Sequence, residues 1–78
     1  MTRRHGKDIY TTTQFSERDA GSAGVELYCE TNGRQKPVAR VVFLDAAGQF
    51  YLEVQGIGIP LNVVEELIAE SKQAIKIK

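Results

Sequence analysis

The chain has 78 residues, 42% of them hydrophobic, and its 10 Lys and Arg residues balance its 10 Asp and Glu residues. This length predicts one domain, whose small core would gain stability from an oligomeric partner, a disulfide or a metal ion. The neutral charge argues against nucleic-acid binding driven by bulk positive charge. No apolar stretch approaches the roughly 20 residues that span a bilayer, so we expect no membrane insertion.

The single cysteine, Cys29, excludes a disulfide within one chain, and the only histidine, His5, lies far from it in sequence. We therefore expect no metal site and no cofactor, which leaves association into a homodimer as the source of added stability. The basic N-terminus has no apolar segment behind it, unlike a secretory signal. With the lone cysteine, this pattern predicts a cytoplasmic protein.

Residues 1–24 are polar and contain little core-forming material. Either a disordered arm or an edge strand followed by a long loop fits this composition. The β-branched and aromatic residues at 9–15 favour the edge strand there, whereas residues 1–6 are expected to be disordered. The glycines and small residues near the end of the segment predict a loop over residues 16–24.

The next part of the chain alternates like a β-sheet. Residues 25–31 alternate between apolar and polar side chains, which predicts a half-buried strand. Asn32-Gly33 follows and favours a tight hairpin turn, because both residues tolerate positive φ. Residues 38–44 carry apolar side chains on both faces, as expected for a central strand.

A second turn and a third alternating segment come next. Residues 45–48 are turn-like, with Gly48 at the position where a left-handed residue is often required. Residues 50–55 alternate again between apolar and polar side chains. Gly56 and Gly58 then predict a bend within a further short strand.

The C-terminal segment predicts an amphipathic helix. Asn62 is the expected N-cap, and Glu65 three residues later can return the capping bond. Apolar and small residues then recur on one helical stripe, which comprises Val64, Leu67, Ile68, Ser71 and Ile75.

The predicted fold is α+β, a three- to four-stranded antiparallel β-meander followed by one C-terminal amphipathic helix, with residues 25–78 as the packed unit. The side chains expected to point inward are Val25, Leu27, Cys29, Val42, Leu44, Phe50, Leu52, Val54, Ile59, Leu61, Val64, Leu67, Ile68 and Ile75.

The sequence predicts no catalytic residues. Cys29 alternates with core positions, so it is expected to act as a small buried hydrophobe rather than as a nucleophile. The acidic residues Glu26, Glu30 and Glu53 fall at exposed alternating positions, which favours a solvated sheet face over paired acid–base carboxylates. Gly56-x-Gly58 lacks the third glycine and the βαβ context of a dinucleotide-binding motif. We therefore expect a protein that is not an enzyme.

One group of residues suits single-stranded nucleic acid. Outward aromatic side chains can stack on bases, and nearby cations can attract the phosphate backbone. The alternative is that the tyrosines cover part of the sheet or are buried by a partner subunit, and the composition favours this reading because acidic residues share the face. The candidate nucleic-acid-binding residues are Tyr28, Arg34, Lys36, Arg40, Tyr51, Arg3 and Arg4.

Two segments resemble a known family. Gly58-Ile59-Pro60-Leu61-Asn62, followed by the helix, resembles the strand-to-helix junction of the positive-cofactor-four type of single-stranded DNA-binding transcriptional coactivators. Arg40-Val41-Val42-Phe43-Leu44-Asp45 and Phe50-Tyr51-Leu52-Glu53-Val54 are similar to the central hairpin of that family. The resemblance implies a curved antiparallel sheet with one C-terminal helix, a homodimer formed largely through the helices, and grooves for single-stranded DNA.

The chain departs from that family at the central turn, where the family carries lysines and an aromatic and this chain has Ala46, Ala47 and Gln49. The resemblance therefore supports the fold more than it supports DNA binding. The sequence as a whole predicts a small non-catalytic binding or interaction module that forms a homodimer. The alternative is a single-stranded nucleic-acid-binding protein resembling the transcriptional coactivators.

Overall fold

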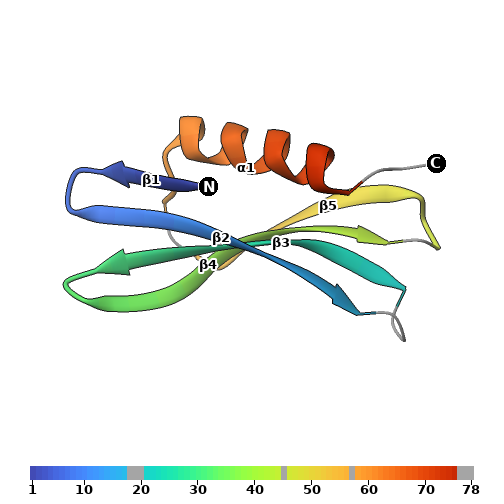
Figure 1. The fold of residues 1–78 in the computed structure, drawn as a ribbon, viewed down its shortest axis with the longest axis horizontal. Helices are drawn as coiled ribbons and strands as arrows, with labels where there is room; N and C mark the ends of the chain where they lie inside the picture. The colour runs from blue at the N-terminus through green and yellow to red at the C-terminus, as the bar shows by residue number, and fades with distance from the viewer. Residues whose placement is uncertain (18–20, 45, 57, 76–78) are drawn as a thin grey trace.

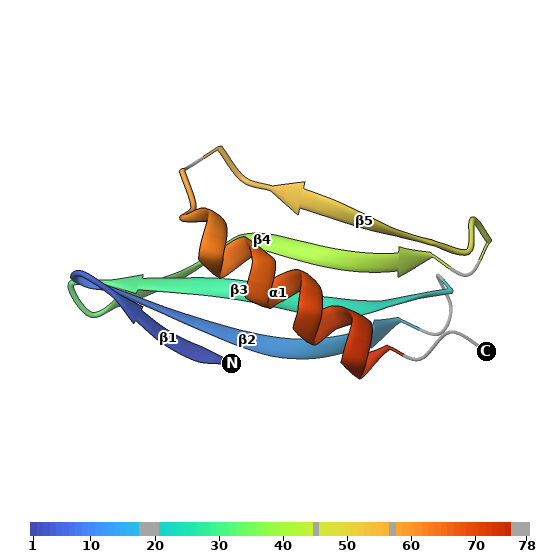
Figure 2. The ribbon, with the colours of Figure 1, turned by 90° about the horizontal axis from the view of Figure 1, so that it is seen from above.

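The computed structural model describes residues 1–17, 21–44, 46–56 and 58–75. Five strands form one antiparallel sheet in chain order, and a single helix lies diagonally across one face of it (Figures 1 and 2). The elements are β1 (Thr2–His5), β2 (Asp8–Glu17), β3 (Ser22–Thr31), β4 (Arg34–Leu44), β5 (Gln49–Val54) and α1 (Leu61–Ala74). The α+β class is confirmed, but the sheet has five strands rather than three or four.

The extra strand lies at the N-terminus, where residues 1–6 were expected to be disordered. Thr2–His5 forms β1 and pairs with β2 through a turn in which Gly6 has a φ of 65°. β1 pairs with Asp8–Thr11 only, so the first part of the strand predicted over residues 9–15 is interior, whereas the rest of β2 pairs with β3 alone. β2 also continues to Glu17 and β3 already begins at Ser22, so the predicted loop is shorter than expected; residues 18–20 lie outside the described residues.

Two contacts with the helix hold β1 in place. The Met1 ammonium forms an ion pair with Glu70 at 2.8 Å and donates a hydrogen bond to the Thr12 hydroxyl at 2.7 Å. The Arg3 guanidinium pairs with Glu66 one helical turn away from Glu70. Composition alone gave no sign of these pairs, because each joins the first residues of the chain to its last element.

The β3–β4 hairpin has the predicted turn. Asn32 and Gly33 have φ values of 55° and 78°, which is the two-residue geometry that Asn-Gly favours. Further along, the register shifts at Leu27/Tyr28, so that β4 contains one residue more than β3. Val38 is the extra residue, and both Val38 and Ala39 are buried. The bulge therefore interrupts the alternation expected for β4.

The β4–β5 turn is also as predicted at Gly48, which has a φ of 64° and donates its N–H to the Leu44 carbonyl at 2.8 Å. Asp45 lies outside the described residues. The further strand predicted around the glycines is wrong. β5 ends at Val54, Gly56 has a φ of 67°, and residues 58–60 lead into α1 without pairing; Ile57 lies outside the described residues.

The helix is present, but its start and its buried stripe differ from the prediction. Its N-cap is Pro60, with no side-chain capping bond, so Asn62 already lies in the first turn. The buried positions are Val63, Leu67 and Ser71, and Ser71 donates its hydroxyl proton to the Leu67 carbonyl at 2.7 Å. Val64 is only half-buried. Leu67 and Ser71 are therefore buried as predicted, and Val63 takes the buried position that was expected for Val64.

The core lies between α1 and the middle of the sheet. Its buried members are Tyr10, Val25, Leu27, Cys29, Val38, Ala39, Val41, Val63 and Leu67, with Met1, Phe50, Ile59 and Ile68 packed around them. Burial of Cys29 agrees with the prediction.

Several residues predicted to point inward do not. Val41 lies opposite Val25 on the helix side of β4, so Val42, although it is buried as expected, lies on the other face of the sheet, opposite Gly24. Leu52 and Val54 are 46% and 48% exposed, and Leu61 is 77% exposed. The placement of these three side chains in the core is therefore wrong: Leu52 and Val54 lie on β5, beside the helix rather than under it, and Leu61 is the exposed first residue of α1.

Candidate functional site

The helix covers only part of the sheet. α1 packs against β2, β3 and β4, and β5 lies to one side of it, beyond β4 (Figure 2). By register, Phe50, Leu52 and Val54 point toward the same face as Val41 and Ala39, which is the face that carries the helix. These three side chains therefore stand on the helix side of the sheet without a helix above them.

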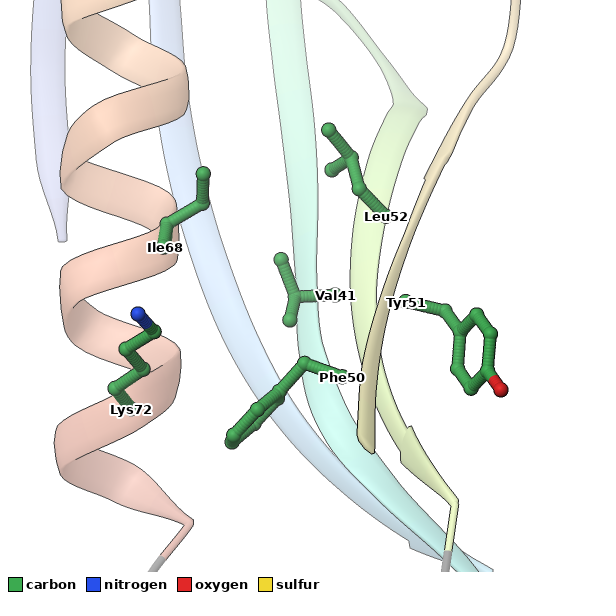
Figure 3. Close-up of a pocket in the computed structure, with 6 residues that line it drawn as sticks. All are labelled: Val41, Phe50, Tyr51, Leu52, Ile68 and Lys72. Atoms are coloured by element: carbon green, nitrogen blue, oxygen red, sulfur yellow. The ribbon is translucent and has the colours of Figure 1, made fainter. Parts of the chain in front are cut away.

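A shallow hollow of about 160 Å³ lies between the helix and β5. Figure 3 shows Ile68 from the helix, Val41 from β4 and Phe50 and Leu52 from β5 around it, whereas the Tyr51 ring points away to the other side of the strand. Lys72 places its ammonium group near the rim. The ring of Phe50 packs against the ring of Phe43, with 5.0 Å between the centroids. The result is an apolar depression with one cation at its edge.

The hollow is too small for most ligands. Sites that bind small molecules or cofactors generally enclose about 300–1,000 Å³ and include several convergent polar groups. Here the lining is apolar except for Lys72 and Tyr51. The hollow continues into the exposed side chains of Leu52 and Val54, so it forms one margin of a wider apolar surface. We call this surface the β5 patch; it comprises Phe50, Leu52, Val54 and Ile68.

Tyr10 and the thiol of Cys29 lie next to each other in the core. Burial, followed by the adjacent Cys29, raises the pKa of the Tyr10 phenol. Tyr10 and Cys29 lie opposite each other on β2 and β3 beneath the helix. A tyrosine with a raised pKa keeps its proton at neutral pH, so it does not act as a base toward the thiol. This pair is part of the core.

The described residues include no group of three or more His, Cys, Asp or Glu side chains placed to hold a metal ion. Among those same residues, no helix has the length and apolar character needed to cross a membrane.

The face of the sheet away from the helix holds four of the candidate nucleic-acid-binding residues by register, namely Arg4, Tyr28, Arg40 and Tyr51. Arg40 is engaged there: it pairs with Glu53 on β5, and its guanidinium lies 5.8 Å from the centre of the Phe15 ring.

Tyr28 is similarly engaged with an acidic neighbour. Its hydroxyl donates a hydrogen bond to Glu26, which raises the pKa of the phenol by favouring its protonated form. Glu26, Glu30 and Glu53 all lie on this face, and carboxylates repel a phosphate backbone. On this face, Arg40 and Tyr28 are therefore each paired with a glutamate.

The other three candidates lie on the helix side of the sheet by register, and Arg4 stands at one end of the face away from the helix. Arg3 is bound to Glu66 of the helix. Arg34 and Lys36 lie opposite Thr31 and Cys29, on the helix side by register and near the β3–β4 turn. Arg4 is exposed on β1. The structure therefore brings the seven residues to three different places.

Two hairpin turns do meet at one end of the molecule. The β1–β2 turn and the β3–β4 turn lie side by side in both views (Figures 1 and 2), and Thr31 donates a hydrogen bond to Asp8 at 2.6 Å between them. This end carries the exposed cations Arg4, Lys7, Arg34 and Lys36.

No protein-family model, no curated protein and no solved structure matches this chain. The positive-cofactor-four resemblance therefore stays a prediction.

The sequence-based prediction missed the β5 patch because Phe50, Leu52 and Val54 alternate like residues of a buried strand. The relevant signal is the order of the elements. β5 is the last strand before the helix, and the last strand of a meander is an edge.

Proposed function

We propose that this protein is a small, non-catalytic interaction module that acts as a homodimer. The observation that carries the proposal is the β5 patch, in which Leu52 and Val54 each leave nearly half of their surface exposed beside an apolar hollow. Contiguous apolar surfaces at the edge of a small domain are typical of protein–protein contacts. A domain of this size also gains stability by burying such a surface against a partner.

The polar side chains support a non-catalytic role. Cys29 lies in the core beside Tyr10, and among the carboxylates Glu53 and Glu26 are engaged with Arg40 and Tyr28. These side chains contact neighbouring residues of the fold and do not converge on a cleft, as catalytic side chains do. The hollow described above is apolar, and an apolar surface suits binding better than proton transfer.

Sedimentation velocity across a wide range of protein concentration tests this proposal. We expect the wild-type protein to sediment as a dimer that dissociates on dilution. Replacing exposed Leu52 with lysine should shift the equilibrium to monomer, because a charge would have to be desolvated at the contact. Gln14→Lys is the matched control, since Gln14 is exposed on the distant strand β2. A wild-type protein that remains monomeric at the highest concentration would rule out the homodimer.

Single-stranded nucleic-acid binding is the second candidate. The observation in its favour is the end of the molecule where the two hairpin turns meet and where Lys7, Arg34 and Lys36 are exposed. The resemblance to single-stranded DNA-binding coactivators adds to it. Against it, the tyrosines predicted to stack on bases lie on a face rich in glutamates.

An NMR titration with a short oligo-dT at low and then at higher salt distinguishes the candidates. Binding through the cationic end predicts shifts at Arg34 and Lys36 that weaken steeply with salt, because phosphate contacts release counterions. The double variant Arg34→Ala/Lys36→Ala should lose most of the shift, and Lys72→Ala on the helix should not. Spectra that do not change at low salt would reject nucleic-acid binding and leave the homodimer proposal untouched.

A further inference from the structure

The two edges of the sheet differ in how they are protected. β1 is four residues long and carries Arg3, Arg4 and His5. Short, charged edge strands resist pairing with another chain. β5 has six residues, and Glu53 is its only charged side chain. β5 has no strand beside it other than β4 among the described residues, so its outer edge presents a row of backbone donors and acceptors.

The ladder between β4 and β5 indicates which backbone groups lie on that edge. Gln55 donates its N–H to the Val38 carbonyl at 3.0 Å, at the end of the ladder. Hydrogen-bonded pairs alternate along an antiparallel ladder, so odd-numbered residues of β5 direct their backbone groups to β4. The N–H and C=O groups of Phe50, Leu52 and Val54 therefore face outward, and these are the residues whose side chains form the β5 patch.

We infer that β5 pairs with β5 of a second copy of this chain, antiparallel and with Leu52 opposite Leu52 of the partner subunit. This inference rests on the proposed homodimer and specifies its geometry. It joins two five-stranded sheets into one, with both helices on the same face. The twofold axis is normal to the sheet at Leu52.

The register follows from the chemistry of the strand. With Leu52 on the axis, all three outward backbone positions form bonded pairs, and Phe50 lies opposite Val54 of the partner subunit. On the other face, Tyr51 lies opposite Glu53 of the partner subunit. An axis at Glu53 would set like charges against each other, which is unfavourable. An axis at Tyr51 would leave Val54 without an opposing strand residue.

A second copy is the occupant that best fits this edge. With Leu52 opposite Leu52 of the partner subunit, the outward backbone N–H and C=O groups of both β5 strands form hydrogen bonds. The same segment therefore provides both halves of the contact. The chain has equal numbers of acidic and basic residues, so two copies do not repel each other through net charge. The apolar side chains of both copies also gather on the side of the sheet where each hollow lies, which extends the covered surface from the strand toward Ile68.

Cysteine cross-linking tests the register with a closely matched pair of variants. Leu52→Cys and Val54→Cys replace apolar residues of similar exposure two positions apart on β5. In the inferred dimer the α-carbons at position 52 of the two copies lie about 5.5 Å apart, within the range that a disulfide spans. The α-carbons at position 54 would be offset by four residues along the strand, about 13 Å. Wild-type protein controls for buried Cys29.

We expect mild oxidation to convert most of Leu52→Cys, and little of Val54→Cys or the wild type, to covalent dimer. A mixture of Phe50→Cys and Val54→Cys should cross-link as a heterodimer. If wild-type protein sediments as a dimer but Leu52→Cys does not cross-link, the dimer uses another surface and this inference fails while the proposed function stands. Equal cross-linking of both single variants would reject the register. A monomer by sedimentation would reject both proposals.

Discussion

On the face of the sheet that carries the helix, β3 and β5 present similar apolar side chains, but α1 covers only those of β3. On β3, Val25, Leu27 and Cys29 are buried beneath α1. On β5, Phe50, Leu52 and Val54 have the same spacing and the same orientation, yet Leu52 and Val54 are about half exposed. The difference shows that alternation identifies a face of a strand, whereas burial depends on what lies above that face.

Ion pairs also connect the helix to the β1 side of the sheet. Glu66 and Glu70 on α1 pair with Arg3 and the Met1 ammonium at the β1 side of the sheet. These pairs join the helix to the β1 side of the sheet, at the opposite edge from β5. The position of the helix therefore leaves an apolar strand at the opposite edge, where the proposal places the partner subunit.

The largest difference is expected between Leu67→Ala and Leu52→Ala. Leu67 is fully buried, so its truncation should lower the free energy of unfolding by about 2–5 kcal/mol. In dilute, monomeric protein, truncation of Leu52 should change stability by no more than about 0.5 kcal/mol. Urea denaturation at low protein concentration measures both. Equal losses would mean that β5 belongs to the covered core.

A second pair of substitutions compares two glycines. A β-carbon on Gly24 would clash with the Val41 carbonyl oxygen and would meet the Phe15 ring at 2.8 Å, whereas one on Gly58 would meet nothing within 4 Å. Gly24→Ala should therefore cost about 1–3 kcal/mol of stability through overpacking. Gly58→Ala should leave the melting temperature nearly unchanged. A Gly24→Ala protein as stable as wild type would contradict the close packing of β2, β3 and β4.

The smallest effect concerns the ion pair at β1. Burial favours a higher pKa for the Glu70 carboxyl, but hydrogen bonds from the Met1 ammonium and Thr12 outweigh it and lower the pKa below the usual value of 4.5. The contribution to stability is therefore complete above pH 4.5 and is lost as the pH falls through the lowered pKa. Glu70→Gln should cost roughly 0.2–1 kcal/mol at neutral pH.

Urea denaturation from about pH 7 to about pH 3 tests this pair, with Glu65→Gln on the exposed side of the helix as the control. The wild-type advantage over Glu70→Gln should shrink in the acid range. An advantage that stays constant across that range would show that the carboxylate charge is not what holds β1 to the helix.

Local chemistry predicted the parts of the fold that depend on neighbours in sequence. Asn32-Gly33 and Gly48 adopt the left-handed conformations that their turns require, and the alternation of β3 correctly placed Cys29 in the core. The helix was predicted from its period. Its start was not, because Asn62 matched a capping pattern while Pro60 occupies the cap.

The rest depends on contacts between distant residues. β1 was missed because its polar residues are ordered by pairing with β2 and by ion pairs to α1. The β4 side chains were assigned to the wrong face, because both faces are apolar and the bulge at Val38 changes the alternation. The residues of the β5 patch were assigned to the core because the alternation of apolar residues does not indicate which strands the helix covers. The candidate nucleic-acid-binding residues were selected because they are aromatic or basic, and the fold places them apart.

Residue-resolved hydrogen exchange at two protein concentrations tests whether the outer edge of β5 is covered by a second copy of the chain. The amides of Phe50, Leu52 and Val54 are expected to exchange slowly in concentrated protein and quickly in dilute protein. The amides of Tyr51 and Glu53, directed to β4, should be protected at both concentrations. Exchange of Phe50, Leu52 and Val54 that does not depend on concentration would contradict pairing through β5.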